Sequence, residues 1–404
     1  MTGVMAKQTL AAVSIAGLLN AFFSFSGCST ASKPVEHPML FPSSAKAVPA
    51  EKLWTRRVPG LLTDLNLSRD GSTVLIATVP DKDALDAKAN RSQYLAVFYS
   101  AAGKLLSQTE MPAQIKSQSL SADGAVGVIA TYDDQIRAYD RSGKQLWEAE
   151  AFCKSILLSS VKRVLCFHDD DAQPEVGFEV FDMKGKKESE FPIQNDALVL
   201  KVAADEKSFV IALTHGKIIV FNSHFKPVAH KSVSGEVVDV AISSSSGGKP
   251  TVAVLYNQKK SSQKKLAIFA KKNTDWSVNE RADQIEIAPD GSAVFGYANS
   301  GEGQVLMRYG DKPAEVWKRA EKISSEYSSQ IVVSSEQVWV GFQDTAPASI
   351  QHSHILGFEY SGGIQTNFEV PSDEGAFLYT FAVSPTSQTI AVGSDDGHLS
   401  LFKL

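Results

Sequence analysis

The stretch from Leu120 to Trp147 reads L-S-A-D-G-A-V-G-V-I-A-T-Y-D-D-Q-I-R-A-Y-D-R-S-G-K-Q-L-W, with strand and turn signals in close succession. The Ala-Asp-Gly sequence at 122–124 predicts a tight turn, because Gly accepts the positive φ that such turns require. The apolar run from Gly127 to Thr131 has the length of one buried strand. Tyr132 to Gln135 predicts a hairpin, and a third strand, a Ser-Gly-Lys turn and the start of a fourth strand follow. Four short antiparallel strands are therefore expected in this one stretch.

The same pattern recurs along the chain. Its strand-turn-strand opening returns at Leu67–Val79, Ala203–Thr214, Ile287–Ala298 and Val383–Ser394. The turn falls roughly every 44 residues, as expected of a repeat that builds one structural unit at a time. We place the eight turns at Gly71, Gly124, Lys162, Glu206, Gly248, Gly291, Glu336 and Ser387. The sequence thus predicts an all-β fold, a single β-propeller of four-stranded antiparallel blades, with eight blades favoured over seven.

The two ends of the repeat region complement each other. Lys52 to Val58 reads as a lone strand before the first repeat, while Phe381 to Leu404 supplies three strands. We expect the N-terminal strand to complete the last blade, because a closed ring removes the free edges that an open propeller exposes. The propeller is therefore predicted to span residues 52–404.

Residues 1–27 are expected to be a signal peptide outside the fold. Their apolar stretch is short and interrupted, and it ends in Phe25-Ser26-Gly27-Cys28. This ending resembles the lipobox of bacterial lipoproteins, although Leu is commoner where this chain has Phe25. The resemblance implies that Cys28 carries the lipid, and several acyl chains would hold the protein firmly on a membrane. The alternative is an ordinary secretory signal that ends near a cysteine.

Residues 28–51 are predicted to form a flexible tether, because four prolines stand among Ser, Ala and Lys without alternation. Ser29 follows the lipobox cysteine, where lipoproteins retained in the inner membrane usually have Asp. By this resemblance the protein is expected in the bacterial cell envelope, anchored to the outer membrane and facing the periplasm. The inner membrane remains the alternative location.

The segment from Ala138 to Trp147 resembles the tryptophan-docking repeat of the PQQ-like β-propellers, with Ser142 in place of Thr. The matching residues are Ala138, Asp140, Gly143, Lys144 and Trp147. The resemblance implies that Trp147 packs between neighbouring blades while the Asp and the Gly-Lys turn fix its strand. Trp317 and Trp54 are candidates for the same role elsewhere. The plan of signal, tether and propeller is also similar to the propeller lipoproteins of the outer-membrane β-barrel assembly machinery.

Two cysteines lie inside the predicted propeller. Cys153 and Cys166 fall on the first two strands of one blade. Our alignment pairs residue 153 with 168 and residue 155 with 166, which makes the two thiols diagonal neighbours about 7 Å apart. Two buried free thiols are therefore the favoured interpretation, and a disulfide in an oxidising periplasm is the alternative.

The sequence contains neither a recognisable metal-binding motif nor a recognisable catalytic motif. The zinc spacings are absent, and His168 with its three following Asp residues lacks the calcium-loop pattern. No nucleophile elbow is visible, and a quinoprotein would need a cation site and commonly an adjacent Cys pair. We therefore expect no cofactor, no PQQ and no metal.

One lysine-rich hairpin has two interpretations. Lys259, Lys260, Lys264 and Lys265 precede and enter a short apolar strand. A solvated hairpin is the favoured interpretation. The alternative is a basic loop that contacts an acidic partner or lipid head groups.

The net charge and the predicted export argue against a nucleic-acid-binding function. The chain of 404 residues carries 40 basic and 45 acidic side chains, a net charge of −5, and export removes it from nucleic acid. The expected function is a non-catalytic scaffold for envelope proteins, in outer-membrane protein assembly or envelope maintenance. The alternatives are a propeller enzyme, such as a quinoprotein-like dehydrogenase, a hydrolase or a lyase, and a glycan or small-ligand binder.

Overall fold

A computed structural model gives the fold. It describes residues 50–80, 93–168, 176–193, 197–203, 205–244, 250–258, 263–269, 276–280, 282–300, 303–310, 315–321, 330–344, 352–370, 378–384, 386–394 and 396–404. Within these ranges every regular element is a β-strand. The described part of the chain contains no helix with the length and apolarity needed to cross a membrane.

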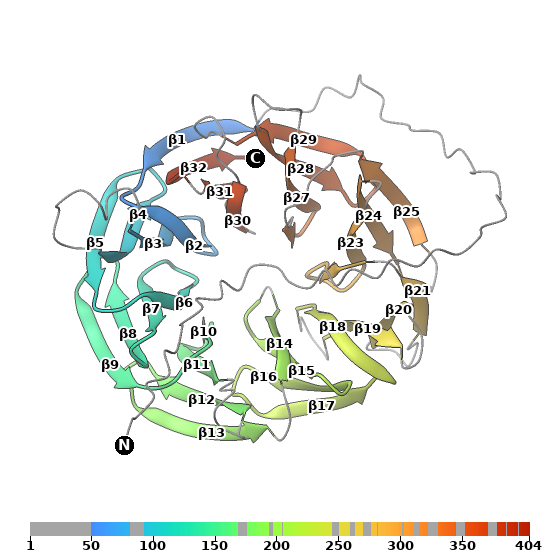
Figure 1. The fold of residues 1–404 in the computed structure, drawn as a ribbon, viewed down its shortest axis with the longest axis horizontal. Coiled ribbons are helices and arrows are strands. Elements are labelled where there is room, and N and C mark those ends of the chain that lie inside the picture. Colours follow the sequence, from blue (N-terminus) through green and yellow to red (C-terminus); the bar gives the residue numbers. More distant parts are fainter. Residues whose placement is uncertain are drawn as a thin grey trace, which may run out of the picture. The chain divides into compact units, whose positions relative to one another are not determined.

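The strands form eight antiparallel sheets of four strands each, arranged around a ring (Figure 1). Blade 1 contains β2 (Leu61–Leu67), β3 (Thr73–Val79), β4 (Tyr94–Ser100) and β5 (Leu105–Met111), and blade 2 contains β6 (Ile115–Leu120), β7 (Val126–Thr131), β8 (Gln135–Asp140) and β9 (Gln145–Glu150). Blade 3 contains β10 (Ser155–Leu158), β11 (Arg163–His168), β12 (Val176–Asp182) and β13 (Lys187–Ile193). Blade 4 contains β14 (Ala197–Val202), β15 (Ser208–Leu213), β16 (Lys217–Asn222) and β17 (Pro227–Ser232).

Blade 5 contains β18 (Gly235–Ile242), β19 (Val252–Gln258), β20 (Lys264–Phe269) and β21 (Trp276–Glu280), and blade 6 contains β22 (Gln284–Ile287), β23 (Val294–Ser300), β24 (Gly303–Tyr309) and β25 (Glu315–Glu321). Blade 7 contains β26 (Ile331–Val333), β27 (Gln337–Asp344), β28 (His352–Glu359) and β29 (Ile364–Glu369). Blade 8 contains β30 (Leu378–Ser384), β31 (Thr389–Ser394), β32 (His398–Lys403) and β1 (Glu51–Arg57). The predicted eight-bladed propeller is confirmed.

The ring closes through β1, as the sequence predicts. This strand pairs with β32 in an antiparallel ladder that runs from Glu51 opposite Lys403 to Arg57 opposite His398. The backbone N–H of Val58 then donates to the carbonyl of Gly397 at 2.8 Å. The first strand of the fold therefore supplies the outer edge of the last blade, next to blade 1 (Figure 1).

The turn after the innermost strand contains a residue with positive φ in six of the eight blades, and Glu336, the turn residue predicted for blade 7, is not one of the positive-φ residues. Gly71, Gly124 and Gly291 have positive φ at this turn, as Gly residues tolerate. Lys162 and Glu206 have φ of 58° and 55° at the same place in their own blades, where the repeat spacing predicts the turn. In the last blade the positive φ falls on Gln388, one residue after the predicted Ser387. Gly248 lies outside the described residues.

The hydrophobic core lies between the blades, where the faces of neighbouring sheets meet. One buried cluster combines Leu75 and Phe98 of blade 1 with Ile129 and Tyr139 of blade 2. A Cβ on Gly127 would lie 2.7 Å from the Phe98 ring, so Gly leaves room for this aromatic side chain. Because each blade is stabilised by its neighbours, the ring is expected to unfold as one unit.

Candidate functional site

The turn of the docking motif is organised by one carboxylate. Asp140 Oδ1 accepts hydrogen bonds from the backbone N–H groups of Ser142 at 2.8 Å and Lys144 at 3.1 Å. The Ser142 hydroxyl donates to the same oxygen, and these bonds lower the pKa of Asp140 below its ordinary value. Gly143 has a φ of 82° in this turn, and Ala138 is fully buried beside it.

Trp147 lies between blades 2 and 3. Its ring is 8% exposed, and a Cβ on Gly185 of the next blade would lie 2.8 Å from it. Trp54 has the same relation to blade 1, because a Cβ on Gly103 would lie 2.7 Å from its ring. The Trp54 indole N–H also donates to the carbonyl of Ala101 at 2.8 Å. Two outermost strands thus place a tryptophan on the glycine turn of the following blade.

Cys153 and Cys166 form a disulfide, so the expectation of two free thiols is wrong. Their Cα atoms are 5.3 Å apart, and both residues are buried. The predicted register was one residue off, since Cys166 pairs with Ile156 and not with residue 155. Cys153 precedes β10, and the bond therefore ties the connection between blades 2 and 3 to β11.

An exposed aromatic pair lies beside this disulfide, and sequence reasoning missed it. Tyr132, in the β7–β8 hairpin, is 60% exposed, and Phe152, in the β9–β10 connection, is 40% exposed. The Lys116 ammonium lies 5.0 Å from the centroid of the Tyr132 ring and 4.2 Å from that of Phe152. It also pairs with Asp134 at 2.9 Å. We call Tyr132, Phe152 and Lys116 the aromatic patch.

Hydrogen bonds fix both segments that carry the aromatic patch. The Ala151 N–H donates to the carbonyl of Asp134 at 2.9 Å, which joins the connection to the hairpin. The Tyr132 N–H donates to the carbonyl of Gln114 at 2.9 Å. Next to Phe152, the disulfide between Cys153 and Cys166 holds the chain. The two rings are therefore presented on an ordered backbone.

The predicted basic hairpin is only partly described. Lys259 and Lys260 lie outside the described residues, as does Cys28. The Lys264 ammonium donates to the carbonyl of Ala282 at 3.0 Å and to the Asp283 carboxylate at 2.5 Å. Lys264 thus links β20 of blade 5 to the residues that precede β22 of blade 6, and its ammonium already has partners within the protein. Lys265 is half-buried and pairs through its backbone with Tyr256 and Asn279.

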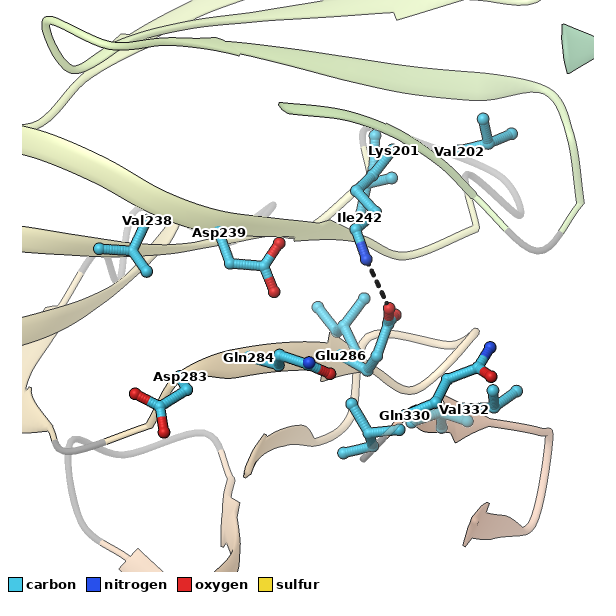
Figure 2. A pocket seen from close by; sticks show the side chains of 13 residues that line it. Lys201, Val202, Val238, Asp239, Ile242, Asp283, Gln284, Glu286, Gln330 and Val332 are labelled. Carbon is cyan, nitrogen blue, oxygen red and sulfur yellow. Dashed lines mark hydrogen bonds and ion pairs between the residues drawn. The ribbon is translucent and has the colours of Figure 1, made fainter. Parts of the chain in front are cut away.

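A cavity of about 570 Å³ opens against the innermost strands of four consecutive blades, β14, β18, β22 and β26 (Figure 2). Lys201 and Glu286 face each other across it, with Nζ 2.9 Å from Oε1. These side chains are 35% and 26% exposed, so the pair is partly open to solvent. We call this space the inner-strand cavity; it is lined by Lys201, Val202, Val238, Asp239, Ile242, Asp283, Gln284, Glu286, Ile287, Gln330, Ile331, Val332 and Val333.

Three charged groups in the inner-strand cavity influence one another. Glu286 raises the pKa of Lys201 well above its ordinary value, against the effect of burial and with a further contribution from Asp239. Burial raises the pKa of Glu286 and of Asp239, although Lys201 acts in the opposite direction on both. Lys201 therefore compensates the negative charges of Glu286 and Asp239 only in part.

Asp239 has a second, structural role. Its Oδ1 accepts the N–H of Val240 and its Oδ2 accepts the N–H of Ile285 in the next blade, both at 2.8 Å. A similar link joins the innermost strands of blades 2 and 3, where the backbone N–H of Ile156 donates to Ser117 Oγ at 3.1 Å. In blade 1, Asp64 accepts backbone N–H bonds, and burial raises its pKa to about 6. These side chains join neighbouring blades around the inside of the ring.

One group of side chains contains the residue types of a catalytic triad. The Ser394 hydroxyl contacts the Asp396 carboxylate and the carbonyl of His398, and His398 Nδ1 lies 2.8 Å from Asp396 Oδ2. The serine is fully buried, and both it and the imidazole are directed at the carboxylate. Nucleophilic catalysis requires the imidazole to reach the serine. Here both side chains contact the carboxylate instead, so the arrangement is that of a hairpin, β31–β32, stabilised by side-chain hydrogen bonds. The described residues contain no gathering of three or more His, Cys, Asp or Glu side chains suited to a metal ion.

Comparison with known proteins supports the fold. No protein-family model matches the sequence, and no curated protein matches it. Among solved structures, the chain is similar to BamB from Moraxella catarrhalis, with 15% identity, a TM-score of 0.59, and coverage of 88% of this chain and 100% of that one. It is also similar to the β-propeller domain of Cps50 (Swd1) from Myceliophteria thermophila, with 11% identity, a TM-score of 0.52 and the same coverage. At such low identity, these likenesses show that the chain has the β-propeller fold.

Proposed function

We propose that this protein is a lipid-anchored, non-catalytic propeller of the bacterial envelope that holds protein partners in the periplasm. The observation that carries the proposal is the aromatic patch, in which Tyr132 and Phe152 are exposed on a backbone fixed by hydrogen bonds and a disulfide. Protein interfaces are enriched in aromatic side chains, and a rigid anchor loses little entropy on binding. The similarity to BamB supports a role in outer-membrane protein assembly or envelope maintenance.

The lipid anchor and the tether complete this proposal. Cys28 stands at the end of the lipobox-like sequence, and residues 29–50 separate it from β1, the first strand of the ring. At ~3.3 Å per residue, an extended tether of this length reaches about 75 Å. That reach lets the propeller contact partners some distance from the membrane, on the periplasmic side of the outer membrane.

Replacement of the anchoring cysteine tests the location. Cys28→Ser is expected to move the protein from the membrane fraction to the periplasmic fraction, because the anchoring acyl chains are lost. Fractionation of cells and mass determination of the native protein check this result. A Cys28→Ser protein that is cleaved normally yet remains with the membranes would contradict lipid anchoring at this residue.

Loss of the aromatic patch tests the interaction. Tyr132→Ser combined with Phe152→Ser is expected to reduce co-purification of envelope partners at least tenfold, since aromatic hot spots often contribute ~2 kcal/mol or more each. The melting temperature should change little, because both rings are exposed. Val228→Ser, at a residue 44% exposed on β17, is the matched control. Equal partner recovery from the double variant and the control would remove the patch from the proposal.

A second candidate function is favoured by the inner-strand cavity. A space of about 570 Å³ with a partly buried ion pair has the size and the mixed lining of small-ligand sites. Binding of a small ligand or of a partner side chain is compatible with the scaffold role.

A further inference from the structure

The lining of the inner-strand cavity has two chemically different parts. Val202, Ile242, Ile287, Val332 and Val333 supply aliphatic surface. The other part is polar and contains the ion pair seen in Figure 2. A ligand that fills the cavity must therefore combine an aliphatic stem with a polar head.

The polar part carries an excess of negative charge among the described residues. There, Asp239, Asp283 and Glu286 contribute three carboxylates to the lining, and Lys201 contributes one ammonium. Lys264 reaches Asp283 from the neighbouring blade and compensates that carboxylate. The carboxylates of Asp239 and Glu286 therefore share Lys201, and the ionised side chains of the described lining have a net charge of −1.

The geometry shows where an additional cation would bind. Lys201 lies on β14 and Glu286 on β22, two blades away, and their contact uses Oε1 of Glu286. Among the described residues, Oε2 of Glu286 has no hydrogen-bond partner, and neither does the side-chain amide of Gln284. Both groups line the cavity. They offer acceptor oxygens beside the uncompensated charge.

We infer that the inner-strand cavity binds an aliphatic organic cation, whose ammonium or guanidinium head contacts Glu286 and Gln284 and whose stem packs on the valine and isoleucine side chains. Two sources have this chemistry, a free diamine and a lysine or arginine side chain of a partner protein. An anion is disfavoured because Lys201 is already paired with Glu286, and two further carboxylates line the same space. This site is independent of the aromatic patch, so either proposal can fail without the other.

The test measures binding by calorimetry at neutral pH and low salt, with cadaverine as the free diamine and N-acetyl-Gly-Lys-Gly-amide as the partner-like source. Glutarate, a five-carbon dicarboxylate, serves as the anionic control, and pentan-1-ol tests the stem alone. Binding of cadaverine, of the peptide, or of both supports the site and identifies the source. Binding of glutarate in preference to both cations, or binding of none of the probes, overturns it.

Two variants with opposite expected effects separate binding from loss of structure. Glu286→Gln is expected to weaken cation binding about tenfold, because the cationic head then contacts a neutral amide oxygen instead of a carboxylate. Lys201→Gln is expected to strengthen cation binding several-fold, because it removes the competing ammonium. Glu190→Gln is the matched control, since Glu190 also pairs with a lysine, at 2.6 Å from Lys187, but outside the cavity. A change in the same direction for both cavity variants, or an unchanged affinity in Glu286→Gln, contradicts the inference.

Discussion

A chain that begins at Pro59 is expected to aggregate, or to melt far below a chain that begins at Ala50. The shorter chain lacks β1, which supplies the outer edge of blade 8 and pairs with β32 along its length. It also lacks Trp54, which is buried against blade 1. Truncation of a buried tryptophan alone costs ~3–5 kcal/mol, and the exposed edge of β32 adds an aggregation hazard.

The measurement is thermal unfolding, with light scattering to detect aggregation. The chain beginning at Ala50 is the matched control, because it removes the residues before β1 and keeps the closing strand. A Trp54→Ala variant of the full chain keeps the strand and removes only the indole, so it should fall between the two. Identical melting temperatures for the chains beginning at Pro59 and Ala50 would show that β1 does not close the ring.

Trp147→Ala is expected to destabilise the whole propeller by ~3–5 kcal/mol, or about 5–10 °C in melting temperature. The buried ring of Trp147 packs on the Gly185 turn of the next blade and belongs to a cluster that spans blades 2 and 3. Because neighbouring blades stabilise one another, a loss at this interface should weaken the ring as a unit. Trp147→Phe should cost less, since a ring still fills part of the space.

Leu146→Ala is the control for Trp147, because Leu146 is the preceding residue on β9 and is 44% exposed. It should change the melting temperature little. A ligand-stacking tryptophan would show another pattern, in which binding is lost and the melting curve is unchanged. An unchanged melting curve in Trp147→Ala would thus contradict the structural role.

Turn chemistry allowed the fold to be predicted from the sequence. Gly71, Gly124 and Gly291 identify the repeat because their turns need a positive φ. Lys162 and Glu206 lack this signal, but the repeat spacing placed them correctly. Because each blade repeats the same short-range pattern, errors in one blade do not spread to the next.

The disulfide shows where this reasoning failed. The sequence alignment fixed the register of β10 and β11 to within one residue, and that residue decides which side chains face each other. Cys153 precedes the strand, where the path of the chain is set by the connection between blades. Repeat spacing does not determine that path.

The candidate sites could not be predicted for a related reason. Lys201, Asp239 and Glu286 come from three blades, and their contact depends on the ring geometry rather than on spacing along the chain. In the sequence, Tyr132 and Phe152 look like any other aromatic residues of a β-rich chain. Only their exposure in the folded ring separates them from core residues such as Phe98.

Site-specific crosslinking in intact cells shows whether this propeller holds protein partners through the aromatic patch. A photoreactive amino acid in place of Phe152 is compared with the same amino acid in place of Val228, which is equally exposed on another blade. We expect discrete crosslinks to one or a few envelope proteins from position 152, and none from position 228. Crosslinks that are absent at position 152, or are the same at both positions, would contradict it.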